Sequence, residues 1–319
     1  MRRYNGSMLS LAVLLLATVG LAGDPANTDG GAAGGQSRFF VSATEAASLV
    51  KSGATVLDAR SRGFFWGHLP AAQAVDWMKF RDGWGRTGRL APDLADLARR
   101  LAELGVDERR PVLVYGDSGA GFGEEGRIAW MLAYLGHSRV FVLDGGIAGW
   151  RRAGQPIERG LAGRVASGAR FVPHPQPDLR ADKQAVQAAS AGQGLRLLDV
   201  RSREEFAGAT PYFEARGGHI PGARHLDWHQ LLDAQGRLRP AAELRPLLAS
   251  LGAGPGDSEL IVYCTGGVRS AFVWAALRSL GFARVRNYDG SFWEWAADAS
   301  LPVAGPAPAP LDHAPAAPH

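Results

Sequence analysis

The chain has 319 residues, of which 46% are hydrophobic and 21% are charged. This composition is ordinary for a globular protein and excludes a disordered, collagen-like or coiled-coil chain, and at about 100–200 residues per domain the length predicts two domains. The 35 Lys and Arg residues are interspersed with 31 Asp and Glu residues and leave a net charge of +4, so no basic run indicates a nucleic-acid partner.

The first 22 residues have the pattern of an export signal. Arg2 and Arg3 precede the apolar stretch Met8–Leu16, and small residues follow as far as Ala22. This order of charged, apolar and small residues is typical of a secretory signal peptide. The stretch is shorter than the ~20 residues that span a bilayer, although an uncleaved anchor remains the alternative. We therefore expect an exported, periplasmic protein with no stable membrane insertion after cleavage.

Helical patterns and short apolar runs then alternate. Ser42 and Glu45 form a capping box that opens a helix, which we expect to end near Gly53. The elements that follow are a strand at Val56–Asp58, a helix at Pro92–Leu104, a strand at Val112–Tyr115, a helix at Ile128–Leu135 and a strand at Val140–Leu143. Strands separated by helices predict an α/β fold with a mainly parallel sheet flanked by helices.

The second half of the chain repeats four motifs of the first half in the same order. The matching pairs are Thr55–Arg62 and Arg196–Arg203, Gly67–Ala72 and Gly218–Ala223, Val112–Tyr115 and Leu260–Tyr263, and Asp144–Trp150 and Asp289–Trp295. The repeated elements are a helix at Leu244–Leu251, the strand Leu260–Tyr263, a helix at Ser270–Leu280 and a strand at Val285–Tyr288. Two copies of one domain explain this order.

The repeat sets the expected domain boundaries. We expect a first domain at 37–160, a second at 179–303 and, between them, a linker at 161–178 that contains Gly, Arg, Ser and three prolines. Residues 304–319 are rich in Pro and Ala, and we expect a disordered tail there.

Cys264 is the one cysteine of the chain, so neither an intrachain disulfide nor a four-cysteine zinc site can form. It follows directly after the strand Leu260–Tyr263, and the carboxyl ends of parallel strands are where an α/β sheet places its chemistry. Gly266 and Gly267 allow the loop to curl so that backbone N–H groups point inward, and a helix N-terminus follows. Such a loop favours a thiolate, and Arg269 adds a fixed positive charge at its rim or inside it.

This arrangement predicts that Cys264 is a nucleophile that attacks an anionic substrate and carries a covalent intermediate. The alternative is a structural cysteine that is buried and unreactive. The residues that we expect to bind the substrate are Thr265, Gly266, Gly267, Val268, Arg269 and Ser270.

Taken together, the motifs resemble the rhodanese family of sulfurtransferases in its tandem form, over about residues 39–303. The resemblance rests on Leu198–Arg201, Gly218–Ala223, the loop Cys264–Arg269 and the ending Asp289–Trp295. It implies two tandem rhodanese-like domains, of which the second is catalytic, and a Cys264 that accepts a sulfane sulfur to become a persulfide. The donor implied is a small sulfur anion, usually thiosulfate, and the acceptor is cyanide or a thiol. We expect no cofactor, no metal and a monomeric protein.

The first copy lacks the nucleophile. Gly116 stands where Cys264 would, and the stretch from Tyr115 to Trp130 is four residues longer than its counterpart in the second copy. This resembles the inactive N-terminal domain of the family, which shapes the cleft from its side.

The loop sequence also bears on the donor. Family members that act on thiosulfate typically show Cys-Arg-x-Gly-x-Arg/Thr, and those that act on 3-mercaptopyruvate show Cys-Gly-Ser/Ala-Gly-Val-Thr. Here Gly267 is common to both patterns, Arg269 fits the first, and Val268 fits the second. Thr265 replaces the first pattern's Arg, and Glu205 stands where some members carry a substrate-holding Arg. The loop favours thiosulfate, with 3-mercaptopyruvate as the alternative donor.

Asp199 and Arg201 are candidate supporting residues. They end a strand and could orient the active loop through hydrogen bonds. The same pair, Asp58 and Arg60, occurs in the copy without the cysteine, and this favours a structural ion pair.

Two other function classes remain open. Cysteine phosphatases also join a strand, a Cys loop, an Arg and a helix, but with five residues between Cys and Arg, whereas only Thr265–Val268 intervene here. The smaller loop favours sulfur transfer. A non-catalytic module that carries or senses sulfur would also retain Cys264.

Overall fold

The computed structural model describes residues 38–305, except 84, 164, 166–167, 193 and 254–258. The expected signal peptide and all but two residues of the expected tail lie outside the described residues. Within the part of the chain that is described, no helix is long and apolar enough to cross a membrane.

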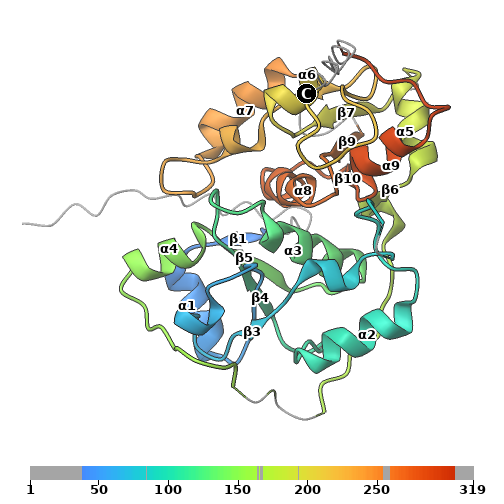
Figure 1. Cartoon of the computed structure of the whole chain (residues 1–319). Coiled ribbons are helices and arrows are strands. Elements are labelled where there is room, and N and C mark those ends of the chain that lie inside the picture. The colour runs from blue at the N-terminus through green and yellow to red at the C-terminus, as the bar shows by residue number, and fades with distance from the viewer. Residues whose placement is uncertain are drawn as a thin grey trace, which may run out of the picture. The chain divides into compact units, whose positions relative to one another are not determined.

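Each half of the chain contains one five-stranded parallel sheet (Figure 1). The first has the order β1-β5-β4-β2-β3, and the second has the corresponding order β6-β10-β9-β7-β8. The strands of the first sheet are β1 (Phe40–Val41), β2 (Thr55–Asp58), β3 (Gln73–Ala74), β4 (Val112–Tyr115) and β5 (Val140–Leu143). Those of the second are β6 (Arg180–Ala181), β7 (Arg196–Asp199), β8 (Arg224–His225), β9 (Leu260–Tyr263) and β10 (Val285–Tyr288). The predicted tandem α/β fold is confirmed.

The helices flank these sheets in the expected alternation (Figure 1). In the first half they are α1 (Ala43–Lys51), α2 (Leu94–Glu103), α3 (Glu124–Tyr134) and α4 (Gly146–Arg152). In the second half they are α5 (Lys183–Ser190), α6 (Arg203–Ala207), α7 (Ala241–Ser250), α8 (Arg269–Ser279) and α9 (Ser291–Ala297). Several bounds differ from the predicted ones, and in one case a cap sets the start. Helix α2, for example, begins after Asp93, whose carboxylate accepts the backbone N–H groups of Ala95 and Asp96.

Capping boxes begin two of the described helices, α1 and α6. The predicted one is confirmed at α1, where the Ser42 side chain accepts the Glu45 N–H and the Glu45 carboxylate accepts the Ser42 N–H. A second one begins α6, with Ser202 and Glu205 in the same two roles. Glu205 is therefore fixed in the first turn of its helix by the local sequence.

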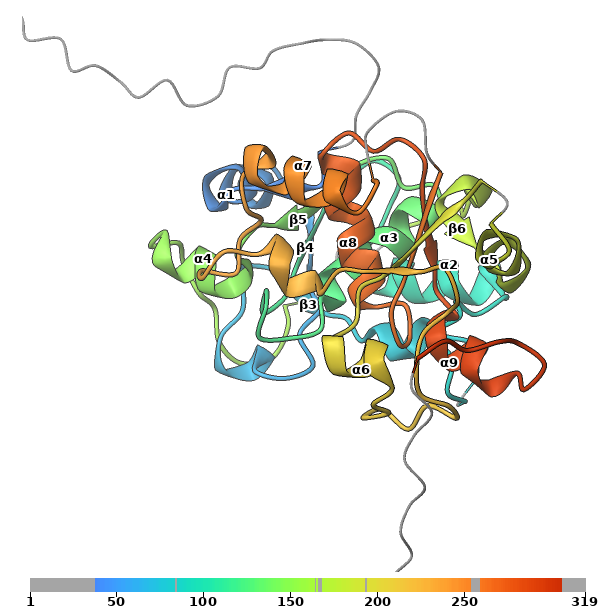
Figure 2. The same cartoon turned by 90° about the horizontal axis from the view of Figure 1, so that it is seen from above.

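Helices α3 and α8 pack against each other, as both views show (Figures 1 and 2). The close approach requires Gly126, because a Cβ atom there would lie 2.3 Å from the Cα atom of Phe272. One apolar cluster contains residues of both halves, among them Val114, Trp130, Val262 and Trp274. The two sheets therefore share a continuous core.

The segment between the halves has little regular structure. The described residues of 161–176 contain neither helix nor strand, and a short 3-10 helix follows at Pro177–Leu179. Strand β6 then begins the second sheet at Arg180.

Candidate active site

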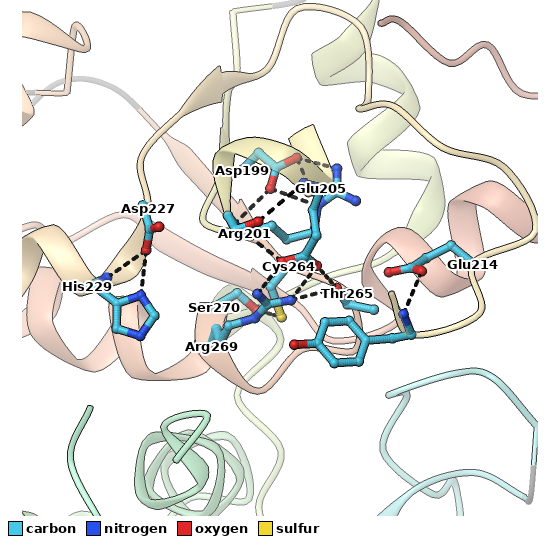
Figure 3. Close-up of polar contacts among 12 residues, drawn as sticks. Asp199, Arg201, Glu205, Glu214, Asp227, His229, Cys264, Thr265, Arg269 and Ser270 are labelled. Carbon is cyan, nitrogen blue, oxygen red and sulfur yellow. Dashed lines mark hydrogen bonds and ion pairs between the residues drawn. The ribbon is translucent and has the colours of Figure 1, made fainter. Parts of the chain in front are cut away.

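Cys264 lies at the carboxyl end of β9, and its Sγ atom faces the loop that leads into α8 (Figure 3). The Gly267 N–H donates to this sulfur over 3.2 Å, and the Ser270 hydroxyl lies 3.6 Å from it. Gly267 has a φ of +75°, a left-handed conformation that side chains disfavour. The inward-pointing N–H expected from the glycine pair is that of Gly267.

The start of α9 binds the backbone of the Cys264 loop through hydrogen bonds. The N–H groups of Phe292 and Trp293 donate to the carbonyl oxygens of Cys264 and Thr265 over 3.0 and 2.9 Å. The Cys264 N–H donates to the Ser291 hydroxyl over 3.2 Å. The repeated Asp-Gly motif ahead of α9 therefore leads into the segment that fixes the backbone of Cys264.

Arg269 is buried, with 6% of its surface exposed, and it forms an ion pair with Glu205 (Figure 3). Its Nη1 and Nη2 atoms donate to the two carboxylate oxygens over 2.6 and 2.8 Å. The Thr265 hydroxyl donates to the same carboxylate over 2.7 Å. The sequence predicted a fixed positive charge at the rim of the loop or inside it. The structure places Arg269 inside, where Glu205 reaches it from α6 and balances its charge.

The environment of Cys264 acts on its pKa in both directions. Burial raises the pKa of the thiol, but the positive charge of Arg269 and hydrogen bonds from Ser270 and the loop backbone outweigh burial and lower it. The sulfur is almost fully enclosed, with 1% of the residue exposed. The site therefore favours a thiolate that is shielded from bulk water.

The first half of the chain also reaches the loop. Arg127 on α3 donates to the carbonyl oxygens of Gly88 and Gly267, the latter over 3.4 Å. Its guanidinium lies over the rings of Trp77 and Trp130. Burial lowers the pKa of Arg127 to about 10, and the charge of Cys264 acts in the opposite direction. A buried cation from the domain without a cysteine thus reaches the carbonyl oxygen of Gly267, the residue whose N–H binds the sulfur.

Asp199 and Arg201 form a buried ion pair, with Arg201 Nη2 2.6 Å from the Asp199 carboxylate. The same Arg201 atom donates to the carbonyl oxygen of Gly218, and the guanidinium lies over the ring of Phe292. In the first half, Arg60 binds Asp58 and the Gly67 carbonyl in the same way.

This repetition supports the structural alternative for Asp199 and Arg201. The pair fixes a turn in each domain, whether or not a cysteine is present.

In the first half, Gly116 follows β4 as Cys264 follows β9. The space that a side chain there would need is taken by Glu125, since a Cβ atom on Gly116 would lie 2.0 Å from its carboxylate. Glu125 is fully buried, and its Oε2 atom has no hydrogen-bond partner among the described residues. Burial raises the pKa of this carboxyl to about 7.

Sequence reasoning missed the contributions of Arg127 and Ser291, and it noted Glu205 only as a departure from the family pattern. The one signal for Arg127 was its position directly before the apolar run Ile128–Leu132. Ser291 had a weaker signal, namely its place after the repeated Asp-Gly motif.

Comparisons with known proteins agree with this geometry. The rhodanese-like domain family matches residues 42–153 and 182–298. A thiosulfate sulfurtransferase of Pseudomonas aeruginosa is 32% identical over 237 residues, which cover 74% of this chain and 85% of that protein. A 3-mercaptopyruvate sulfurtransferase of Escherichia coli is 33% identical over 239 residues, covering 74% and 83%.

Among solved structures, the crystal structure of SseA from Escherichia coli, described as the rhodanese fold of 3-mercaptopyruvate sulfotransferases, superposes with a TM-score of 0.70 at 28% identity. The match covers 80% of this chain and 99% of that one. With both halves matched, the sheets in the same order and relatives of this identity, the chain belongs to the rhodanese family and is a sulfurtransferase with two tandem rhodanese-like domains.

Proposed function

We propose that the protein transfers the outer sulfur of thiosulfate to cyanide or a thiol through a persulfide on Cys264. The observation that carries this proposal is the position of the Cys264 sulfur, within reach of the Gly267 N–H and the Ser270 hydroxyl at the carboxyl end of β9. These donors stabilise negative charge on the attacking sulfur and on the sulfur that it receives.

The reaction has two displacement steps. The Cys264 thiolate attacks the outer sulfur of thiosulfate, the S–S bond breaks, and sulfite leaves with the bonding electron pair. The acceptor then attacks the outer sulfur of the persulfide, and the Cys264 thiolate is released with its electron pair. Cyanide becomes thiocyanate, and a thiolate becomes a persulfide. No external oxidant or reductant is needed.

The donor is the finer part of the proposal. Relatives carry the names of both thiosulfate and 3-mercaptopyruvate enzymes. Arg269 supports thiosulfate, because that position holds Arg or Thr in the thiosulfate pattern and Thr in the other. Val268 supports 3-mercaptopyruvate as the second candidate donor.

The test uses the mass of the intact protein. After thiosulfate treatment and desalting, we expect an increment of one sulfur atom (~32 Da), because the thiolate retains the outer sulfur, and we expect cyanide to remove it. Cys264→Ser should show neither change and should lose transfer activity, because a hydroxyl cannot form a persulfide. Its melting temperature should remain close to that of the wild type.

Ser279→Ala provides a control away from the loop, and it should keep the increment. Transfer activity retained in folded Cys264→Ser would overturn the mechanism. A sulfur increment with 3-mercaptopyruvate but not with thiosulfate would replace the donor. Hydrolysis of a phosphate ester without any sulfur increment would indicate the phosphatase alternative.

A further inference from the structure

The guanidinium of Arg269, next to Cys264, points toward the carboxylate of Glu205. Both terminal nitrogens of Arg269 donate to Glu205, and Nη2 also donates to the Thr265 hydroxyl over 2.6 Å. That hydroxyl in turn donates to Glu205. Three side chains thus form a closed group in which the strongest donors of the loop are satisfied before any substrate binds.

Glu205 is ionised within this group. It is 2% exposed, and burial alone would raise the pKa of its carboxyl. The hydrogen bonds and charge of Arg269 outweigh burial and bring that pKa down to about 2. Near neutral pH the group therefore contains one full negative and one full positive charge.

The other charged groups near Cys264, Arg127 and Asp289, do not pair with Arg269. Arg127 approaches from α3, where it donates to carbonyl oxygens, and Asp289, ahead of α9, accepts from Arg180 over 2.9 Å. Tyr212 lies over Arg269 from the segment after α6, with its ring centroid 5.5 Å from the guanidinium carbon. The balance of charge in the loop itself thus depends on one side chain, Glu205.

Resting on the proposed function, we propose that Glu205 sets the charge selectivity of the donor site: by cancelling Arg269, it weakens the capture of doubly charged sulfur donors relative to singly charged ones. Attraction between a cation and an anion scales with the charge of the anion. Thiosulfate carries two negative charges, so it loses more of its attraction to the site than a singly charged donor does when the Arg269 charge is balanced. Glu205 is accordingly a specificity-determining residue that sits behind the loop.

The test compares two donors that differ in charge but present the same outer sulfur, thiosulfate and methanethiosulfonate. Thiolate attack on methanethiosulfonate releases methanesulfinate, just as attack on thiosulfate releases sulfite. In Glu205→Gln we expect the KM for thiosulfate to fall about three- to tenfold, which corresponds to about 0.7–1.4 kcal/mol at 1.4 kcal/mol per factor of ten. The KM for methanethiosulfonate should fall by about the square root of that factor or less. The exposed cation should also make the thiosulfate KM of the variant rise more steeply with salt.

Glu45→Gln is the matched control. Glu45 occupies the same capping-box position at α1, where it binds Ser42 and Arg38 and lies in the other domain. Gln is accepted at this position of a capping box, so both substitutions disturb a helix start similarly. Only Glu205→Gln changes the charge beside Arg269, and only it should change the ratio of the two KM values.

One further measurement needs no variant. The KM of the wild-type protein for thiosulfate should depend on salt no more steeply than its KM for methanethiosulfonate, because the loop charge is balanced. A steep dependence for thiosulfate alone would overturn the proposal.

A folded Glu205→Gln protein in which the two KM values keep their wild-type ratio would also overturn the proposal. Failure of the proposed function has a different signature, namely the absence of a sulfur increment on wild-type Cys264. The two failures are therefore distinguishable.

Discussion

At the scale of single residues, Glu125 is a carboxylic acid enclosed beside Gly116, the position that corresponds to Cys264. Its only described side-chain donor is the Ser118 hydroxyl, 3.4 Å from Oε1. Burial is the main cause that raises its pKa from 4.5 to about 7, and Glu124 and Asp117 add to this as like charges. The native protein therefore binds a proton here that the unfolded chain releases near pH 4.5.

This difference gives a pH-dependent stability with a definite sign. The contribution of Glu125 is fully favourable below about pH 4.5 and is lost as the pH rises through about 7. We expect Glu125→Gln to remove that dependence, so that at pH 8 the variant is more stable than the wild type by up to about 3 kcal/mol, at about 1.4 kcal/mol per pKa unit.

Urea denaturation at pH 5 and pH 8 measures the difference. Glu108→Gln, at an exposed position, serves as the control and should follow the wild type at both pH values. Equal free energies of unfolding for Glu125→Gln and wild type at pH 8 would show that Glu125 ionises freely in the native state.

At the scale of elements, the strand-to-helix loop depends on contact with the segment that leads to α2. A Cβ atom on Gly88 would lie 1.9 Å from the Gly266 carbonyl oxygen and 2.5 Å from that of Asp289. Both are backbone atoms, so the loop or the segment must move to accommodate a side chain. We expect Gly88→Ala to lower kcat/KM by more than about tenfold, because small misplacements of reacting groups are costly.

Steady-state kinetics with thiosulfate and cyanide test this expectation. Gly85→Ala is the control in the same segment, because a Cβ atom there meets nothing within 4 Å. It should retain wild-type kcat/KM. If Gly88→Ala does the same while remaining folded, the segment does not constrain the loop.

Elements were predictable where their causes are local. The capping box of Ser42 and Glu45 lies within four residues, and the apolar run Leu260–Tyr263 gives β9 its full bounds. Cys264 and the turn at Gly267 follow from that strand and the glycine pair. The site was therefore predictable wherever it depended on consecutive residues.

Contacts between distant segments were not predictable from one sequence. Glu205 and Arg269 are 64 residues apart, and Arg127 and Gly267 are 140 apart. Periodicity assigns a residue to a helix or strand, but it does not say which side chains of different elements meet. The ion pair that neutralises the loop emerged only from the packing of α6 against the start of α8.

At the scale of the whole molecule, one apolar cluster of the described residues spans both domains. The cluster that includes Trp130 of α3 and Trp274 of α8 is continuous across both sheets. Separating the domains would expose this surface, so we expect thermal unfolding in a single transition, with the calorimetric enthalpy equal to the van't Hoff enthalpy.

Gly126→Ala should lower the temperature of that one transition without splitting it, because overpacking between α3 and α8 typically costs about 1–3 kcal/mol. Differential scanning calorimetry provides the measurement, and Gly163→Ala, whose Cβ atom would meet no neighbour within 4 Å, is the control. Two resolved transitions in the wild type would show that the domains unfold independently.

The enclosure of Cys264 has a consequence for its survival as a free thiol. In disulfide exchange the attacking thiolate must approach the S–S bond along its axis. Only 1% of Cys264 is exposed, so the disulfide of a folded protein cannot reach its sulfur in this way. Small oxidants such as peroxide are not restricted by size in this way, and no second cysteine exists in the chain to resolve a sulfenic acid. Burial thus protects the cysteine from mixed disulfides with other proteins, while defence against small oxidants depends on how quickly the sulfur is occupied by its donor.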